Sequence, residues 1–154
     1  MRALIRASLV LPVVAVLLLS GCGDDQVKVN NAYVSATDRA MQAFETEFQQ
    51  LQTSFTAVST PAQDLRTLTA LQAAVDRVVA DLTKVTPPAK IAPLHARLIQ
   101  QVQRYRAIIQ TAKRAFASDD PRRVISARSR FSAALAGVAT QVSATINTIN
   151  ERLR

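Results

Sequence analysis

The chain is poor in the residues that most catalytic and metal-binding sites require. Its 154 residues include one cysteine, one histidine, three glycines and no tryptophan. A single cysteine excludes an internal disulfide, so packing alone must hold the folded part together. Zinc sites need several cysteine or histidine ligands, and neither a phosphate loop nor a Gly-x-Ser-x-Gly elbow occurs in the sequence. We therefore predict that the protein is not an enzyme.

Glutamate is also scarce. Glu45, Glu47 and Glu151 are the only glutamates in the sequence. A di-iron site in a helical bundle draws glutamates from several helices, together with Glu-x-x-His pairs. No glutamate precedes His95 at that spacing, and we predict no metal site.

The first 21 residues have the layout of a secretory signal peptide. Arg2 and Arg6 give a positive start, an apolar run extends from Leu9 to Leu19, and Ser20-Gly21 forms a small-residue exit. A membrane-spanning helix needs about 20 apolar residues, and this run is shorter. Residues 1–21 are therefore predicted to be an export signal that is removed.

The sequence Leu19-Ser20-Gly21-Cys22 resembles the lipobox of bacterial lipoproteins. The resemblance implies that the Cys22 thiol receives a diacylglyceryl group and that the amine of Cys22 is acylated, for example with palmitate, after cleavage. It also implies an exported protein whose membrane partner is reached through the N-terminal lipid. In lipoproteins of bacteria with two membranes, an aspartate directly after the cysteine commonly signals retention in the inner membrane. Gly23 follows Cys22 here, so the resemblance implies the periplasmic side of the outer membrane in such a host. Otherwise, the outer face of the cell membrane is expected. An ordinary cleaved signal peptide is the alternative.

Residues 22–34 are predicted to form a lipidated tether, because Gly23-Asp24-Asp25 and Asn30-Asn31 favour loops. After this segment, apolar residues recur every three or four positions, which is typical of amphipathic helices. We predict four helices at about residues 35–59, 61–85, 90–117 and 121–152.

Prolines mark the helix boundaries. Thr60 and Gln63 form a Thr-x-x-Gln capping box around Pro61 at the start of the second helix. Asp120 and Pro121 are a natural N-cap and first residue for the fourth. The turns between the predicted helices are short, and short turns imply that neighbouring helices are antiparallel. We therefore predict an all-α, up-down-up-down antiparallel four-helix bundle over residues 35–154. A three-helix arrangement, in which the first two helices fuse across Pro61, is the alternative.

His95 is the only histidine and lies on the apolar seam of the third predicted helix. In the predicted bundle, Met41, Asp81, Asn147 and Glu151 lie towards the same end. A Met-His pair at one end of a four-helix bundle resembles the b-type cytochromes. That resemblance implies a carrier of haem or of a small apolar ligand, with Met41 and His95 as its ligand site. The simpler interpretation is a histidine that is hydrogen-bonded to a neighbour, with no cofactor.

Charge is distributed unevenly along the chain. Removal of Arg2 and Arg6 reduces the 19 basic residues to 17, which against 11 acidic residues gives a net charge of +6. Residues Asp24–Thr86 contain eight acids and five bases (−3), whereas Pro87–Arg154 contains three acids and twelve bases (+9). Six cations surround the turn between the third and fourth helices: Lys113, Arg114, Arg122, Arg123, Arg128 and Arg130.

These cations predict a basic tip that binds an anionic envelope component or an acidic protein. Nucleic acid is excluded as a partner by the predicted export.

The fourth helix suggests another role, because Phe131 to Asn150 contains no charged residue. An uncharged helix face accepts another helix. The main prediction is a non-enzymatic binding or scaffolding lipoprotein. A carrier of haem or of a small apolar ligand is the first alternative, and a helix-mediated assembly partner, including a homodimer, is the second.

Overall fold

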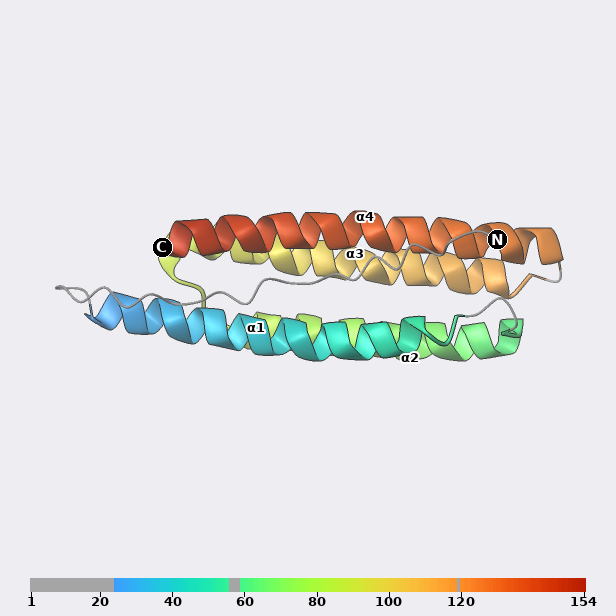
Figure 1. Ribbon diagram of the computed structural model, residues 1–154, viewed down its shortest axis with the longest axis horizontal. Helices are drawn as coiled ribbons and strands as arrows, with labels where there is room; N and C mark the ends of the chain where they lie inside the picture. The colour runs from blue at the N-terminus through green and yellow to red at the C-terminus, as the bar shows by residue number, and fades with distance from the viewer. Residues whose placement is uncertain (1–23, 56–58, 119) are drawn as a thin grey trace, which may run out of the picture.

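The computed structural model describes residues 24–55, 59–118 and 120–154 (Figure 1). Within these ranges the chain forms four long helices, one short 3₁₀ helix and no strand. In order, the elements are α1 (Asp24–Gln52), α2 (Pro61–Lys84), η1 (Ala89–Ile91), α3 (Ala92–Phe116) and α4 (Pro121–Leu153). The predicted all-α class is confirmed. The predicted signal peptide (1–21), Cys22, Gly23 and residues 56–58 of the first predicted helix lie outside the described residues.

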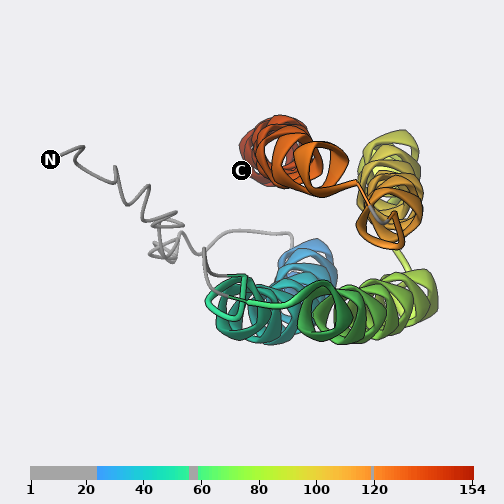
Figure 2. The ribbon, with the colours of Figure 1, turned by 90° about the vertical axis from the view of Figure 1, so that its right-hand side faces the viewer.

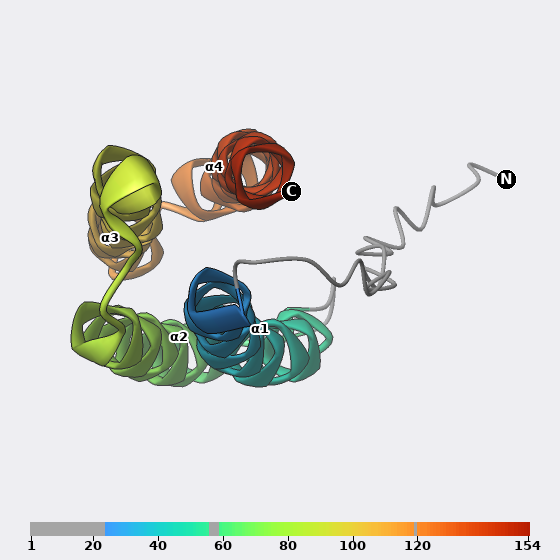
Figure 3. The ribbon, with the colours of Figure 1, turned by 90° about the vertical axis from the view of Figure 1, so that its left-hand side faces the viewer.

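The helices form two layers. Figures 2 and 3 show α1 and α2 side by side in one layer, with α4 and α3 in the other. The start of α1, the α2–α3 connection and the C-terminus lie at one end of the molecule (Figure 1). We call this the proximal end, and we call the opposite end, with Phe55, Ser59 and Asp120, the distal end.

Two helix starts follow the predicted caps. The Thr60 N–H donates to Gln63 Oε1 at 2.7 Å, and the Gln63 N–H donates to Thr60 Oγ1 at 3.3 Å. This reciprocal pair is the predicted capping box of α2. At α4, the Asp120 carboxylate accepts from the Arg122 N–H at 2.9 Å. Both caps satisfy backbone donors that have no partner inside the helix.

The first helix differs from the prediction. Residues 24–34 were predicted as part of a tether and 35–59 as helix, but α1 extends from Asp24 to Gln52. Acidic residues suit a helix N-terminus, where the dipole is positive, so Asp24 and Asp25 favour a helix start rather than a loop. Tyr33, only 3% exposed, fixes the segment against the core. The tether prediction is therefore wrong for residues 24–34.

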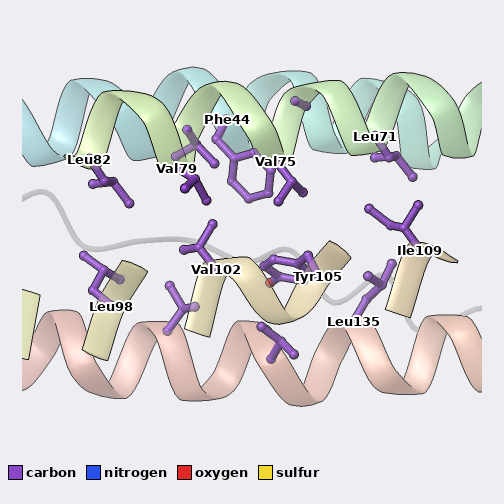
Figure 4. Close-up of a cluster of buried hydrophobic side chains, with 14 of the residues drawn as sticks. Phe44, Leu71, Val75, Val79, Leu82, Leu98, Val102, Tyr105, Ile109 and Leu135 are labelled. Carbon is purple, nitrogen blue, oxygen red and sulfur yellow. The ribbon is translucent and has the colours of Figure 1, made fainter. Parts of the chain in front are cut away.

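The core lies between the two layers. In Figure 4, Leu71, Val75, Val79 and Leu82 of α2 face Leu98, Val102, Tyr105 and Ile109 of α3. All eight side chains are buried.

Aromatic rings connect α1 with α3 across the core. The Tyr105 ring packs against Phe44 and Phe48 of α1, with ring centroids 5.8 and 5.5 Å apart. Burial raises the pKa of the Tyr105 hydroxyl to about 12. Tilted ring pairs of this kind add stability beyond the buried area alone. Among the described helices, none combines the length and the apolar character needed to cross a membrane.

Candidate functional site

The structure divides the six cations of the predicted basic tip into two groups. Lys113 and Arg128 point to partners inside the protein. The Lys113 Nζ is half-buried and donates to Gln72 Oε1 of α2 at 2.8 Å. It therefore lies along the α2–α3 edge, where it links the two layers.

Arg128 belongs to a buried ion pair. Its Nη2 lies 2.6 Å from the Oδ2 atom of Asp64 in α2, and the Asp64 side chain is 0% exposed. The Ser59 hydroxyl donates to Asp64 Oδ1 at 2.7 Å, and Arg128 Nη2 donates to the Ser59 carbonyl at 2.8 Å. Because Arg128 compensates a buried carboxylate, it is a structural residue. We therefore remove Arg128 from the six cations that were predicted to bind an anionic partner.

The other four cations, Arg114, Arg122, Arg123 and Arg130, are exposed at or near the distal end. Arg114 is in the last turn of α3, where a cation suits the helix dipole. Arg122 and Arg123 are in the first turn of α4, where the dipole disfavours them. Arg123 lies 3.8 Å from the Asp120 carboxylate, a long and exposed contact.

Acidic residues are nearly absent from the layer that carries these arginines. The helix α3 contains no aspartate or glutamate, and α4 contains only Glu151. Glu151 is near the proximal end, 21 residues from Arg130 and thus about 30 Å away along the helix. The two layers in Figure 2 therefore differ in charge, with the excess of basic residues confined to α3 and α4.

A groove lies between α3 and α4 near the same arginines. It has a volume of about 360 Å³, and five alanines line it together with Ile108, Thr111, Phe131 and Arg130. Because alanine side chains are short, the two helices leave a hollow where larger residues would interdigitate. Among the described residues that line it, Arg130 is the only charged one. The sequence did not predict this groove, although Ala127 and Ala134 on α4 are spaced seven residues apart.

His95 makes a hydrogen bond with each ring nitrogen. Its Nε2 lies 3.0 Å from the Leu82 carbonyl oxygen of α2, and its Nδ1 lies 3.1 Å from the Tyr33 hydroxyl of α1. A carbonyl oxygen can only accept, so Nε2 carries the proton and Nδ1 accepts from Tyr33. Burial lowers the pKa of His95 below its ordinary value of 6.5. We call these three residues the proximal contact.

The predicted ligand pair is not brought together. Tyr33, rather than Met41, is the residue of α1 that meets His95. Met41 is eight residues farther along α1, which corresponds to about 12 Å along the helix axis. Asp81 pairs with Lys84, at 2.9 Å, and Asn147 and Glu151 are exposed. Within the described ranges, no group of three or more His, Cys, Asp or Glu side chains is arranged to hold a metal ion.

Comparisons of the chain with known protein families, with curated proteins and with solved structures find no match.

Proposed function

We propose that the protein is a bacterial envelope lipoprotein whose distal end binds an anionic partner, in a non-enzymatic binding or scaffolding role. The proposal rests on the group of four exposed arginines, Arg114, Arg122, Arg123 and Arg130, at the distal end of α3 and α4. Within these two helices the only acid is Glu151, near the proximal end, and the turn that joins them adds Asp119 and Asp120. The position of Arg122 and Arg123 against the dipole of α4 costs stability. A binding role accounts for that cost better than a structural role.

The proposal includes the address of the protein. Residues 1–21 act as a signal peptide, and Cys22 carries the lipid. The folded chain is an up-down-up-down bundle on the periplasmic side of the outer membrane, or on the outer face of the cell membrane in a host with one. The helix α1 begins two residues after Cys22 and has 29 residues, a length of about 44 Å. A bundle that stands on this anchor directs its arginines away from the bilayer that holds it.

The binding proposal is tested with two matched double variants. Arg122→Gln/Arg123→Gln removes two positive charges from the distal end, and Arg39→Gln/Arg97→Gln removes two exposed charges from α1 and α3 that lie away from it. We expect the first variant to weaken binding to anionic vesicles and to isolated cell-wall polymer about tenfold at low salt, with a reduced dependence on salt concentration. The second variant should bind nearly as well as the original protein. Equal effects of the two would show that only net charge matters.

The lipid anchor is tested by intact mass. Protein isolated from membranes is expected to begin at Cys22 and to carry a diacylglyceryl group. Labelled palmitate should be incorporated into the original protein and not into a Cys22→Ala variant. An unmodified chain that begins after a different residue would contradict the anchor and leave an ordinary signal peptide as the explanation.

A second candidate function is assembly through α4. The exposed uncharged residues of this helix include Ser132, Ala136, Thr140 and Asn147. An exposed helix face without charge is a suitable contact for another helix. Sedimentation of residues 24–154 at increasing concentration tests self-assembly, and Ala136→Glu should disrupt any dimer that forms. A monomer at all concentrations would reject the homodimer.

A further inference from the structure

We propose that the groove between α3 and α4 binds the alkyl chain of an amphipathic anion, a fatty acid or a lipid with a single free chain, and that Arg130 binds its anionic head. The proposal deepens the proposed function and rests on it only through Arg130, which belongs to both surfaces. It names a chemical class of ligand for a site that the arginines of the distal end alone do not define.

The shape of the groove favours a narrow apolar ligand. Its volume of about 360 Å³ is within the usual range of about 300–1,000 Å³ for small-molecule sites. Ile108 and Phe131 contribute its large side chains, and five alanines form the remainder of the apolar lining. A surface of this kind contacts methylene groups well, and each buried methylene contributes about 0.8 kcal/mol.

The charge at the rim favours an anionic head. Arg130 is exposed, and its Nε and Nη2 donate to the Ser126 carbonyl and hydroxyl oxygens at 3.3 and 2.7 Å. A guanidinium has five N–H donors, so these two bonds orient Arg130 and leave donors for a carboxylate or phosphate. Within the described residues, no ion pair involves Arg130, and no acid on α3 competes for it. A neutral head or a cation would gain less from this rim.

Dodecanoate and dodecanol are suitable probes, because they share a chain and differ in head charge. Residues 24–154, which contain all four helices, should bind dodecanoate saturably below its micelle-forming concentration, as measured by calorimetry. Each methylene removed from the chain should weaken binding about fourfold. The Arg130→Gln variant should bind dodecanoate about tenfold more weakly while its affinity for dodecanol stays the same. The matched control is Arg97→Gln, which removes an exposed charge of α3 that belongs neither to the groove nor to the distal arginines.

Filling the groove tests the position of the chain. Ala134 lines the groove, and leucine at this position would occupy the space of the ligand. We expect Ala134→Leu to weaken the binding of both probes more than tenfold, and Ala133→Leu, on the exposed neighbouring position, to leave it unchanged. Circular dichroism verifies that both variants keep their helices.

Three results would overturn the inference. The first is an absence of saturable dodecanoate binding. The second is full binding by Ala134→Leu. The third is a protein that is dimeric as isolated and becomes monomeric with Ala134→Leu, which would assign the groove to a second copy of the chain. The two proposals can fail separately. If the original protein binds anionic vesicles but not dodecanoate, and Arg122→Gln/Arg123→Gln loses the vesicle binding, then only the distal arginines have a ligand.

Discussion

Two buried polar contacts hold opposite ends of the bundle, and they differ in charge. At the proximal end, neutral His95 joins the Tyr33 hydroxyl of α1 to the Leu82 carbonyl of α2. At the distal end, the ion pair of Asp64 and Arg128 joins α2 to α4 and also binds Ser59, which precedes α2. The proximal contact connects three helices, whereas the distal contact connects α4 to α2 and to the residue just before the capping box of α2.

The difference predicts that the proximal end tolerates substitution better than the distal end. A neutral hydrogen bond that is lost in the interior leaves one unpaired polar atom, which costs about 1–3 kcal/mol. An ion pair that loses one partner leaves a buried charge, and this costs about 3–5 kcal/mol. Loss of the proximal contact is therefore expected to lower stability moderately, whereas the distal contact is expected to decide whether Ser59 and the start of α2 stay packed on α4.

The largest predicted effect is at Arg128. Replacement by methionine keeps a long side chain but leaves the Asp64 carboxylate buried, with the Ser59 hydroxyl as its one remaining side-chain partner among the described residues. Because Arg128 is 26% exposed, water offsets part of the cost, and we expect a loss of about 3 kcal/mol in the free energy of unfolding. Urea unfolding followed by circular dichroism measures it.

The double variant Asp64→Asn/Arg128→Met is the control for this prediction. It removes the charge that Arg128→Met leaves unpaired, so its stability should recover by half or more. A double variant that is less stable than Arg128→Met would show that packing, rather than the unpaired charge, dominates at the distal end.

The corresponding change at the proximal end is Tyr33→Phe. It keeps the ring, whose centroid is 5.6 Å from that of His95, and removes the hydroxyl that donates to Nδ1. The expected loss is about 1 kcal/mol, again by urea unfolding at pH 7.5. A loss as large as that of Arg128→Met would contradict the comparison, since it would make the neutral contact as sensitive as the ionic one.

The sequence predicts the helices well because hydrophobic spacing and proline positions report on local structure. It predicts α2 from Pro61 and α4 from Pro121, where capping residues precede proline. It fails at both ends of α1. The helix ends at Gln52 rather than near residue 59, and at its start Gly23, Asp24 and Asp25 suit both a loop and an acidic first helical turn. The burial of Tyr33, a tertiary contact with α3, resolves that ambiguity.

The buried ion pair was missed for a different reason. Asp64 occupies a position on the apolar seam of α2, four residues before Leu68, which is 0% exposed. A charged residue at such a position is a detectable signal of a buried pair. Its partner Arg128 is 64 residues away, and no local pattern distinguishes it from the exposed arginines around it. The groove was missed because it depends on how α3 and α4 pack, which spacing within one helix does not determine.

A smaller effect is expected from pH. The pKa of His95 is lowered by burial in the folded protein, so below pH 6.5 the unfolded chain binds a proton more readily than the folded one. Stability contributed by neutral His95 is therefore complete above pH 6.5 and is lost as the pH falls through that value towards the folded pKa. Unfolding midpoints between pH 7.5 and 5.5 should decrease for the original protein.

His95→Gln is the control for the pH prediction, because glutamine donates and accepts hydrogen bonds but does not titrate in this range. Since His95 is the only histidine, its removal should flatten the profile. Asp38 acts in the opposite direction at lower pH, because burial raises its pKa. A slope that persists in His95→Gln would assign the effect to carboxylates instead.

The smallest effect is expected at an exposed ion pair that has the same N–O distance as the buried pair of Asp64 and Arg128. Arg106 Nε and Asp76 Oδ1 are 2.6 Å apart and connect α3 to α2, but their side chains are 39% and 47% exposed. After Arg106→Met, water solvates the Asp76 carboxylate, so the loss should be about 0.5 kcal/mol or less. Arg106→Met and Arg128→Met make the same substitution at the same N–O distance, and burial of the carboxylate is the main difference between them. If urea unfolding gave equal losses for both, the distance between the charges would matter more than their exposure, and the contrast between the two ends would need another cause.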